Sequence, residues 1–230
     1  MGDQGEPDPF IAENNRRFEK VTKNLPLKDY EFVVFDTELT GFDAKQNEIV
    51  AIGAVRIRNL QIRSNETFYA LVKPEKHLYT RSTLVHRITP QELVKAESLS
   101  DVLPRFLEFC GDSFLVGHYV RLDLEFINRA TREMMGGVLK TPYLDTLRLA
   151  MAYNELKHGH YYEHSNLHNA YTLAALAKEY NLPEFEMHNA LQDALQTAYL
   201  FLFLVKKMKR HGLRIMDDYL KAGRKWKILL

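Results

Sequence analysis

EFVVFDTELTG, residues 31–41, is the stretch on which the predicted fold depends. Its four consecutive apolar residues, Phe32 to Phe35, are β-branched or aromatic and predict a buried central strand. Asp36 and Glu38 follow directly, and they should leave one face together because side chains alternate along a strand. Adjacent carboxylates repel unless a cation lies between them, and hard divalent ions prefer oxygen ligands. The stretch therefore predicts a candidate metal site at the carboxyl end of a strand, where sheets covered by helices tend to bind ligands.

The rest of the chain predicts an α/β domain built on one mixed sheet. Two apolar runs, at residues 49–57 and 67–72, should form an antiparallel meander with the first strand, with a polar break at residues 64–66. Beyond residue 90 we expect short strands at 114–116 and 143–147, interleaved with helices. Helical spacing of apolar residues predicts helices at 90–96, 102–109, 122–135, 172–180 and 190–208, and residues 11–24 predict a short polar helix ended by Pro26.

Composition limits the class of protein. The chain has 230 residues, of which 46% are hydrophobic and 27% charged, so it can bury a substantial core. This profile excludes a disordered chain, a collagen-like repeat and a disulfide-rich secreted module. Cys110 is the only cysteine, which excludes an intrachain disulfide and favours a reducing compartment. No apolar run approaches the roughly 20 residues needed to span a bilayer, so we expect a cytoplasmic protein without membrane contact.

Charge is unevenly distributed. The net charge of +1 identifies no partner, but residues 206–230 carry nine Lys/Arg and two Asp, a local surplus of +7. We therefore expect an N-terminal arm (1–30), a central domain that carries the candidate site (31–208) and a basic C-terminal tail (209–230). Two interpretations of the tail stay open: contact with phosphates, or the solvated end of a helix. Trp226, Ile228 and Leu229 also suggest docking on a partner or on the domain itself.

Two further motifs carry carboxylates. Asp123 closes GHYVRLD, residues 117–123, and lies at the start of a predicted helix, where an N-cap is the alternative role. HNALQD, residues 188–193, pairs His188 with Asp193. Five helical residues would place these two side chains about 140° apart. We therefore expect His188 at or before the helix start, with its ring over the site. Residues 37–41 follow the first strand, and the backbone N–H groups of Thr40 and Gly41 should be free to approach an anion.

Together the motifs resemble a known family. DTELTG (36–41), GHYVRLD (117–123) and HNALQDA (188–194) look like the three motifs of the DEDDh 3′→5′ exonucleases, RNase H-like enzymes that include the proofreading epsilon subunit of bacterial DNA polymerase III. The resemblance runs from Phe32 to Lys207 and departs from the usual pattern at Leu39, Arg87, Tyr119 and Leu122.

The resemblance implies an RNase H-like mixed sheet and a specific set of roles. Two Mg²⁺ or Mn²⁺ ions would be held by four carboxylates, those of Asp36, Glu38, Asp123 and Asp193. His188 would be the general base, and nucleoside 5′-monophosphates would leave from 3′ ends. The residues expected to contact the terminal nucleotide are Thr37, Leu39, Thr40, Gly41, His86 and Tyr119.

Several alternatives stay open. The substrate is expected to be single-stranded DNA, with RNA as the nearest alternative, because the sequence shows no group that reads the 2′-hydroxyl. A non-catalytic nucleic-acid-binding module is a further alternative, although no expected ligand is lost. A polymerase or another protein could bind the tail. The sequence does not separate a proofreading subunit from a free-standing enzyme, and it leaves the oligomeric state open.

Other residues have alternative roles too. His160, His164 and His168 would share a helix face and suit Zn²⁺, but Gly159 favours a polar loop, and we expect no tightly held zinc. Phe42 and Phe126 are candidate stacking residues, with core packing favoured for Phe126. Asp145 is expected to form a structural hydrogen bond.

Overall fold

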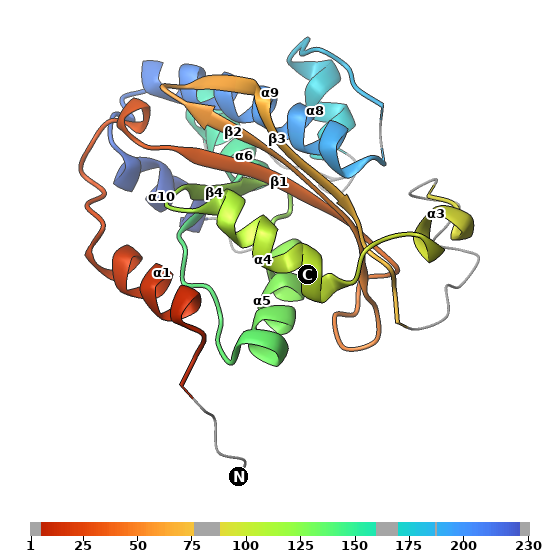
Figure 1. Ribbon diagram of the computed structural model, residues 1–230. Helices are drawn as coiled ribbons and strands as arrows, with labels where there is room; N and C mark the ends of the chain where they lie inside the picture. Colours follow the sequence, from red (N-terminus) through yellow and green to blue (C-terminus); the bar gives the residue numbers. More distant parts are fainter. Residues whose placement is uncertain (1–5, 76–87, 160–169, 187, 226–230) are drawn as a thin grey trace.

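The computed structural model describes residues 6–75, 88–159, 170–186 and 188–225, and their centre is a five-stranded sheet (Figure 1). The strand order is β3-β2-β1-β4-β5. β1 pairs antiparallel with β2 and parallel with β4, β2 pairs antiparallel with β3, and β4 pairs parallel with β5. The predicted mixed sheet with a three-strand meander is therefore confirmed. The strands are β1 (Phe32–Leu39), β2 (Ile49–Arg58), β3 (Gln61–Leu71), β4 (Phe114–Gly117) and β5 (Tyr143–Asp145).

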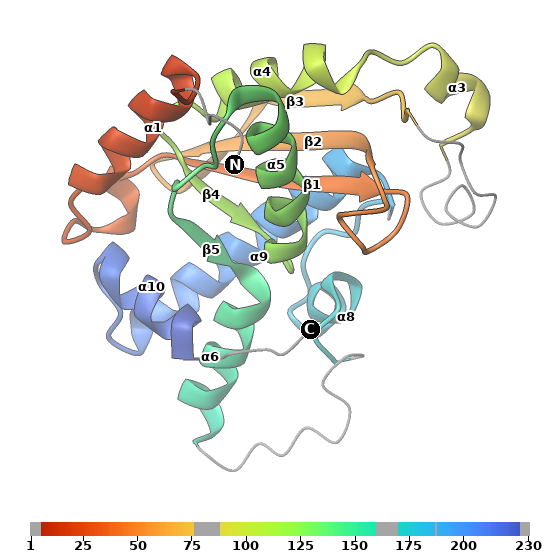
Figure 2. The ribbon, with the colours of Figure 1, turned by 90° about the horizontal axis from the view of Figure 1, so that it is seen from below.

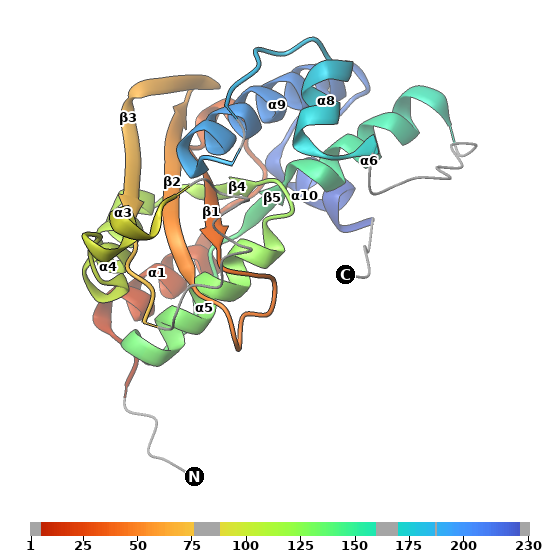
Figure 3. The same cartoon turned by 90° about the vertical axis from the view of Figure 1, so that its right-hand side faces the viewer.

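Helices cover both faces of the sheet, as Figures 1 and 3 show. β1 explains the two layers, because its side chains alternate: Phe32 and Val34 belong to the core beneath α6, α8, α9 and α10, whereas Val33 and Phe35 belong to the core beneath α4 and α5. The helices are α1 (Pro9–Lys20), the 3₁₀ turn η1 (Leu27–Asp29), α3 (Pro90–Val94), α4 (Leu99–Cys110), α5 (Arg121–Met135), α6 (Thr146–His158), α8 (Leu173–Glu179), α9 (Ala190–Arg210) and α10 (Met216–Lys225). Within the described segments, no helix combines the length and apolarity needed to cross a membrane.

The helices predicted beyond residue 90 differ from their expected bounds by one to three residues at an end, and three further elements, β3, β5 and α1, differ for identifiable reasons. β3 begins at Gln61 and runs through the predicted polar break, because a register shift opposite Val55 and Arg56 accommodates residues 64–66 at the sheet edge. The strand predicted at 143–147 ends at Asp145, whose carboxylate accepts a hydrogen bond from Leu147 N and so caps α6, a helix that we did not predict. α1 spans 9–20 rather than 11–24, since Val21 is already extended.

The chain segments around the central domain also pack onto it. α1 buries Ile11 and Phe18 in the two cores, and the Phe18 ring meets Phe114 edge-on. α10 buries Tyr219 and Leu220 against the core that α6 covers. Backbone N–H groups at the start of α10 donate to carbonyls of residues 23 and 25. The division into arm, domain and tail stays a prediction, and residues 226–230 lie outside the described part of the chain.

Candidate active site

β1 carries two carboxylates to its carboxyl end. Asp36 and Glu38 lie on the same face as Val34, because the strand alternates, and this is the face that α9 covers. A register irregularity between Glu38 and Leu39 ends the regular pairing with β2 directly after the second acid. The apolar run thus becomes a buried strand, and the acids that follow it remain on the helix-covered face.

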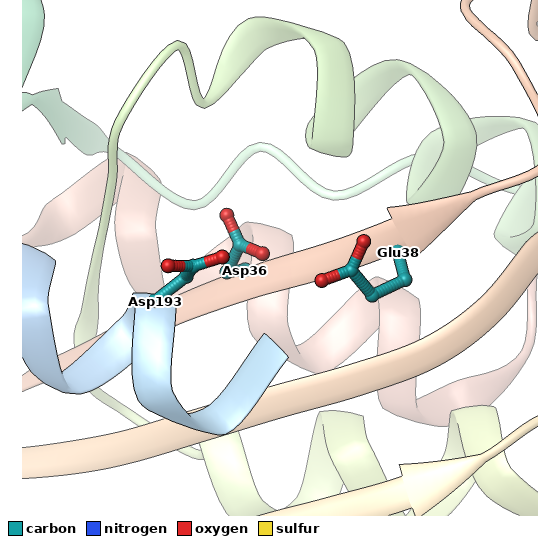
Figure 4. Close-up of side chains that lie close together, drawn as sticks. All are labelled: Asp36, Glu38 and Asp193. Carbon is teal, nitrogen blue, oxygen red and sulfur yellow. The ribbon is translucent and has the colours of Figure 1, made fainter. Parts of the chain in front are cut away.

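α9 supplies the third carboxylate. Asn189 caps the helix, its side chain accepting from Leu191 N and Gln192 N, so Asp193 projects from the first turn. Carboxylate oxygens of Asp36, Glu38 and Asp193 all lie within 4.8 Å of one another, and Figure 4 shows the three side chains converging from strand and helix. Two elements more than 150 residues apart in sequence therefore form one acidic cluster.

This cluster is electrostatically unfavourable by itself. Burial, together with repulsion from Asp123, Asp193 and Glu38, raises the pKa of Asp36 well above its ordinary value. Burial and the charges of Asp193 and Asp123 raise the pKa of Glu38 to about 7. Burial also raises the pKa of Asp193. Glu38 Oε1 is buried and has no hydrogen-bond partner among the residues that the structure describes. Buried polar atoms are normally satisfied, and oxygen donors are what hard divalent cations prefer. The cluster therefore fits a divalent cation.

Asp123 lies beside the cluster rather than within the three-carboxylate group. It extends from α5, and Thr37 donates to its Oδ1 through both the backbone N (3.1 Å) and the side-chain hydroxyl. Burial raises the pKa of Asp123 to about 7, and these hydrogen bonds partly offset that effect. Its charge nevertheless raises the pKa of both Asp36 and Glu38. The structure thus groups three of the four expected carboxylates, and Thr37 links the fourth to the same strand.

His188 precedes α9, as predicted from its spacing to Asp193. It has a φ of +64°, and its backbone N donates to Asp193 Oδ2 at 3.0 Å. The exposed side chain of His188 lines a pocket of about 460 Å³ that also includes Asp36 and Asp193. The far wall of this pocket comes from α8, with Leu173 among its residues, and from Phe185. The imidazole therefore borders the same space as the acids.

The loop after β1 differs from the expectation at Thr40. Thr40 N donates to Glu48 O (2.9 Å), and Glu48 N donates back to Thr40 Oγ1 (2.9 Å). The prediction of a free Thr40 N–H for an anion is therefore wrong, because the turn uses that donor itself. Gly41 is confined by Asn47, whose side-chain atoms lie 2.7 Å from where a Cβ would be. Leu39 packs on the core beneath α4 and α5.

The other candidate contact residues are distributed differently. Tyr119 has a φ of +56° and donates its backbone N to Asp145 Oδ1 (3.2 Å), which supports the structural role expected for Asp145. Phe126 is a core residue at 1% exposure, as favoured, whereas Phe42 is 85% exposed. His86, and His160, His164 and His168 of the histidine-rich segment, lie outside the described residues.

Two residues beside the site were missed by sequence reasoning. A Cβ on Gly53 would lie 2.2 Å from Ala190 C and Leu191 N, so α9 can approach β2 only because this residue is glycine. A glycine inside a strand pattern is a signal of such close approach. His118 bridges Thr146 Oγ1 and the carbonyl of Tyr171, both at 2.9 Å, and burial lowers its pKa to about 4. His118 is therefore a neutral link between β4 and the segment that precedes α8.

The chain is similar to several known proteins. The exonuclease family model of RNase T type matches residues 33–201. DNA polymerase III of PolC type from Thermotoga maritima is 34% identical over 204 residues, covering 87% of this chain but 14% of that protein. DNA polymerase III subunit epsilon from Aquifex aeolicus is 35% identical over 183 residues, covering 79% of this chain and 84% of that protein.

Solved structures share the fold. E. coli exonuclease I in complex with a dT13 oligonucleotide superposes with a TM-score of 0.67 at 18% identity, over 79% of this chain and 42% of that one. The residues that the family model matches include nearly all of β1 and therefore Asp36 and Glu38.

Proposed function

The chain belongs to the 3′→5′ exonuclease family of RNase T type, and we propose that it hydrolyses single-stranded DNA from the 3′ end and releases nucleoside 5′-monophosphates. The observation that carries this proposal is the convergence of Asp36, Glu38 and Asp193 at the end of β1, where a buried Glu38 oxygen has no partner in the described segments. A solvated strand end would leave its carboxylates in water and apart. A cluster held together by packing is typical of an anionic site that a cation completes.

Two Mg²⁺ or Mn²⁺ ions would be held by these three carboxylates and by Asp123. Bound there, divalent ions would stabilise negative charge on the attacking and leaving oxygens of an in-line phosphoryl displacement. The chain contributes the arrangement of the acids. β1 presents Asp36 and Glu38 from one face, α9 holds Asp193 over them, and the two hydrogen bonds from Thr37 fix the rotamer of Asp123.

His188 would take the proton from the attacking water. An imidazole accepts a proton near neutral pH, and His188 borders the pocket that contains Asp36 and Asp193. The hydrogen bond from the backbone N of His188 to the Asp193 carboxylate couples the position of the base to a residue of the acidic cluster. A change in the first turn of α9 would therefore displace the base and the acid together.

DNA is the favoured substrate. The relatives are named as DNA polymerase III proteins, and the exonuclease I structure holds a DNA oligonucleotide. The likeness to an epsilon subunit over most of its length also supports a polymerase as partner. RNA and DNA differ at the 2′-hydroxyl, so matched substrates separate the two activities.

The test is digestion of 5′-labelled DNA and RNA oligonucleotides of one sequence, single- and double-stranded, with product mapping. Asp36→Ala and His188→Ala should each lower the rate by roughly 100-fold or more. Asp29→Asn is the matched control, because Asp29 is exposed near the opposite end of β1. Undiminished digestion by Asp36→Ala or His188→Ala would refute the roles given to these residues. If RNA is digested faster than DNA, RNA is the substrate.

A further inference from the structure

A second pocket lies at the β5 edge of the sheet, away from the acidic cluster. Its volume is about 420 Å³. Figure 2 shows α10 beside β5, with the segment that follows α1 nearby. The pocket is formed by these elements and the start of α6, and its side chains include Lys23, Lys140, Tyr143, Arg148 and Arg224. Four chain segments thus contribute to one concavity.

The charge of this pocket is strongly positive. Lys23, Lys140, Arg148 and Arg224 face a single acid, Asp145. The carboxylate of Asp145 is already engaged, because it accepts from Tyr119 N and Leu147 N.

Three of the four cations are weakly paired or unpaired in the described part of the chain. The side chains of Lys23 and Arg224 form no ion pair within the described part of the chain. Lys140 has only an exposed contact with Glu19 at 3.5 Å, and Arg148 Nε lies 3.8 Å from Asp145. The Lys140 pair is exposed and contributes little, whereas Arg148 and Asp145 are largely buried, so Lys23, Lys140 and Arg224 are the cations that remain available to an anion.

The other two cations of α10, Lys221 and Lys225, are already paired with acids. Lys221 pairs with Asp217, and Lys225 pairs with Glu155. Of the cations on α10, Arg224 is therefore the one that turns to this pocket unpaired. Apolar surface is present as well, since Leu144 and Leu220 line the same space. A basic groove combined with aromatic and apolar surface is typical of sites for single-stranded nucleic acid, in which phosphates contact cations and bases stack.

We propose that this pocket, the β5–α10 pocket, binds backbone phosphates of the same strand whose 3′ end occupies the acidic cluster. The inference rests on the proposed function. Asp145 connects the two sites, because it lines the pocket and also holds Tyr119, which lies in the turn that leads to Asp123. A strand leaving the acidic cluster along the β5 edge would reach the cations. An acidic peptide would meet the same charges, and the binding experiment distinguishes it from a nucleic acid.

Gly223 offers a way to test the pocket without removing a cation. It lines the pocket on α10, and apart from the backbone of its own helix and its chain neighbours, no heavy atom of the described residues lies within 4 Å of where its Cβ would be. Gly223→Glu therefore places a negative charge in the pocket without a steric clash. Arg224→Glu is the second variant. Arg210→Glu is the matched control for Arg224→Glu, since Arg210 is exposed at the end of α9 and both substitutions change the net charge by two units; Arg210→Gln, which changes it by one unit, is the corresponding control for Gly223→Glu.

Binding is measured by fluorescence anisotropy with a long single-stranded oligonucleotide in EDTA, which prevents turnover. Each phosphate contact on a single strand makes the logarithm of the binding constant fall with the logarithm of the salt concentration with a slope of about −0.7. One contact therefore changes the affinity about 8-fold between 50 mM and 1 M salt. Gly223→Glu and Arg224→Glu should each weaken binding about 8-fold at 50 mM salt and flatten the slope by about 0.7. We expect turnover of a trinucleotide, chosen to occupy the acidic cluster alone, to stay unchanged.

The outcomes separate the two proposals. If Gly223→Glu and Arg224→Glu bind the long strand as their Arg210 controls do, with the same salt slope, the pocket does not bind phosphates. The same holds if these variants weaken binding of poly-glutamate but not of the oligonucleotide, which would indicate an acidic protein partner. Failure of the wild-type protein to digest the trinucleotide would instead count against the proposed function, and the binding result would stand independently.

Discussion

Gly53→Ala tests how the acidic cluster is assembled. Gly53 is the residue of β2 that pairs with Asp36 in the antiparallel register. The first turn of α9 crosses directly over it, so that an added Cβ would lie 2.2 Å from Ala190 C and from Leu191 N. Both contacts are backbone atoms of a helix and cannot rotate aside. Alanine at this position must therefore move the start of α9 away from the sheet.

The structure sets the size of this movement. Ordinary van der Waals contact begins at 3.4 Å, so the first turn must retreat by about 1.2 Å, the difference from 2.2 Å. Asp193 and the backbone of His188 move with it. Metal-ligand distances tolerate about 0.2 Å, and a misplacement of about 1 Å at a reacting centre can lower a rate about 100-fold. We expect a rate loss of that order and a loss of about 1–3 kcal/mol in the free energy of unfolding, as for an overpacked core.

The assay is steady-state digestion over a range of Mg²⁺ concentrations, with urea unfolding of the same preparations. Gly223→Ala is the matched control: it has open space around the new methyl group and should stabilise α10 by about 0.5–1 kcal/mol without changing the turnover of a trinucleotide. A folded Gly53→Ala protein with wild-type turnover and wild-type Mg²⁺ dependence would refute the reasoning, because α9 would then not be positioned by its contact with Gly53.

Three further predictions concern charge. Glu38, whose pKa is raised to about 7, must lose a proton before it binds a cation. The affinity for Mg²⁺, measured by calorimetry, should therefore rise as the pH increases through about 7. Glu38→Gln should flatten that rise. His118 has a pKa lowered to about 4, so on acidification the unfolded chain is protonated first, near pH 6.5. The stability that His118 contributes above pH 6.5 should therefore be lost as the pH falls from about 6.5 to 4. The difference in unfolding free energy between wild type and His118→Asn should shrink over that range. A constant difference would contradict the conclusion that the buried His118 ring is neutral. Arg56, whose side chain is 13% exposed, pairs with Glu66 at 3.2 Å, and Arg56→Met should lower the free energy of unfolding by about 2 kcal/mol in urea titrations. Arg105→Met, at an exposed pair, should change it by less than about 1 kcal/mol, and equal effects would contradict this ranking.

Much of the fold follows from local pattern. The run from Phe32 to Phe35 is apolar throughout because both of its faces are buried, and that pattern predicted the central strand without reference to its partners. α9 was predictable for the same reason, since its apolar positions repeat at helical spacing. The bounds of β3 were not, because the edge of a sheet tolerates polar residues such as Asn65 and a register shift absorbs the extra length. α6 was missed because Asp145 ends a strand and caps a helix at once.

The acidic cluster shows why sequence reveals some parts of a site and conceals others. Carboxylates placed after an apolar strand are visible in sequence, because charge there is unexpected. What forces them together is not visible. Asp36, Glu38 and Asp193 repel one another, so their approach must be driven by the burial of the apolar face of α9, including Phe201 and Leu204. α9 can pack against β2 in this way only because Gly53 has no side chain. The sequence does not reveal this role of Gly53, because the helix that contacts it begins more than 130 residues later in the chain. The acids thus identify the chemistry, while the packing of α9 against β2 determines whether they form one site.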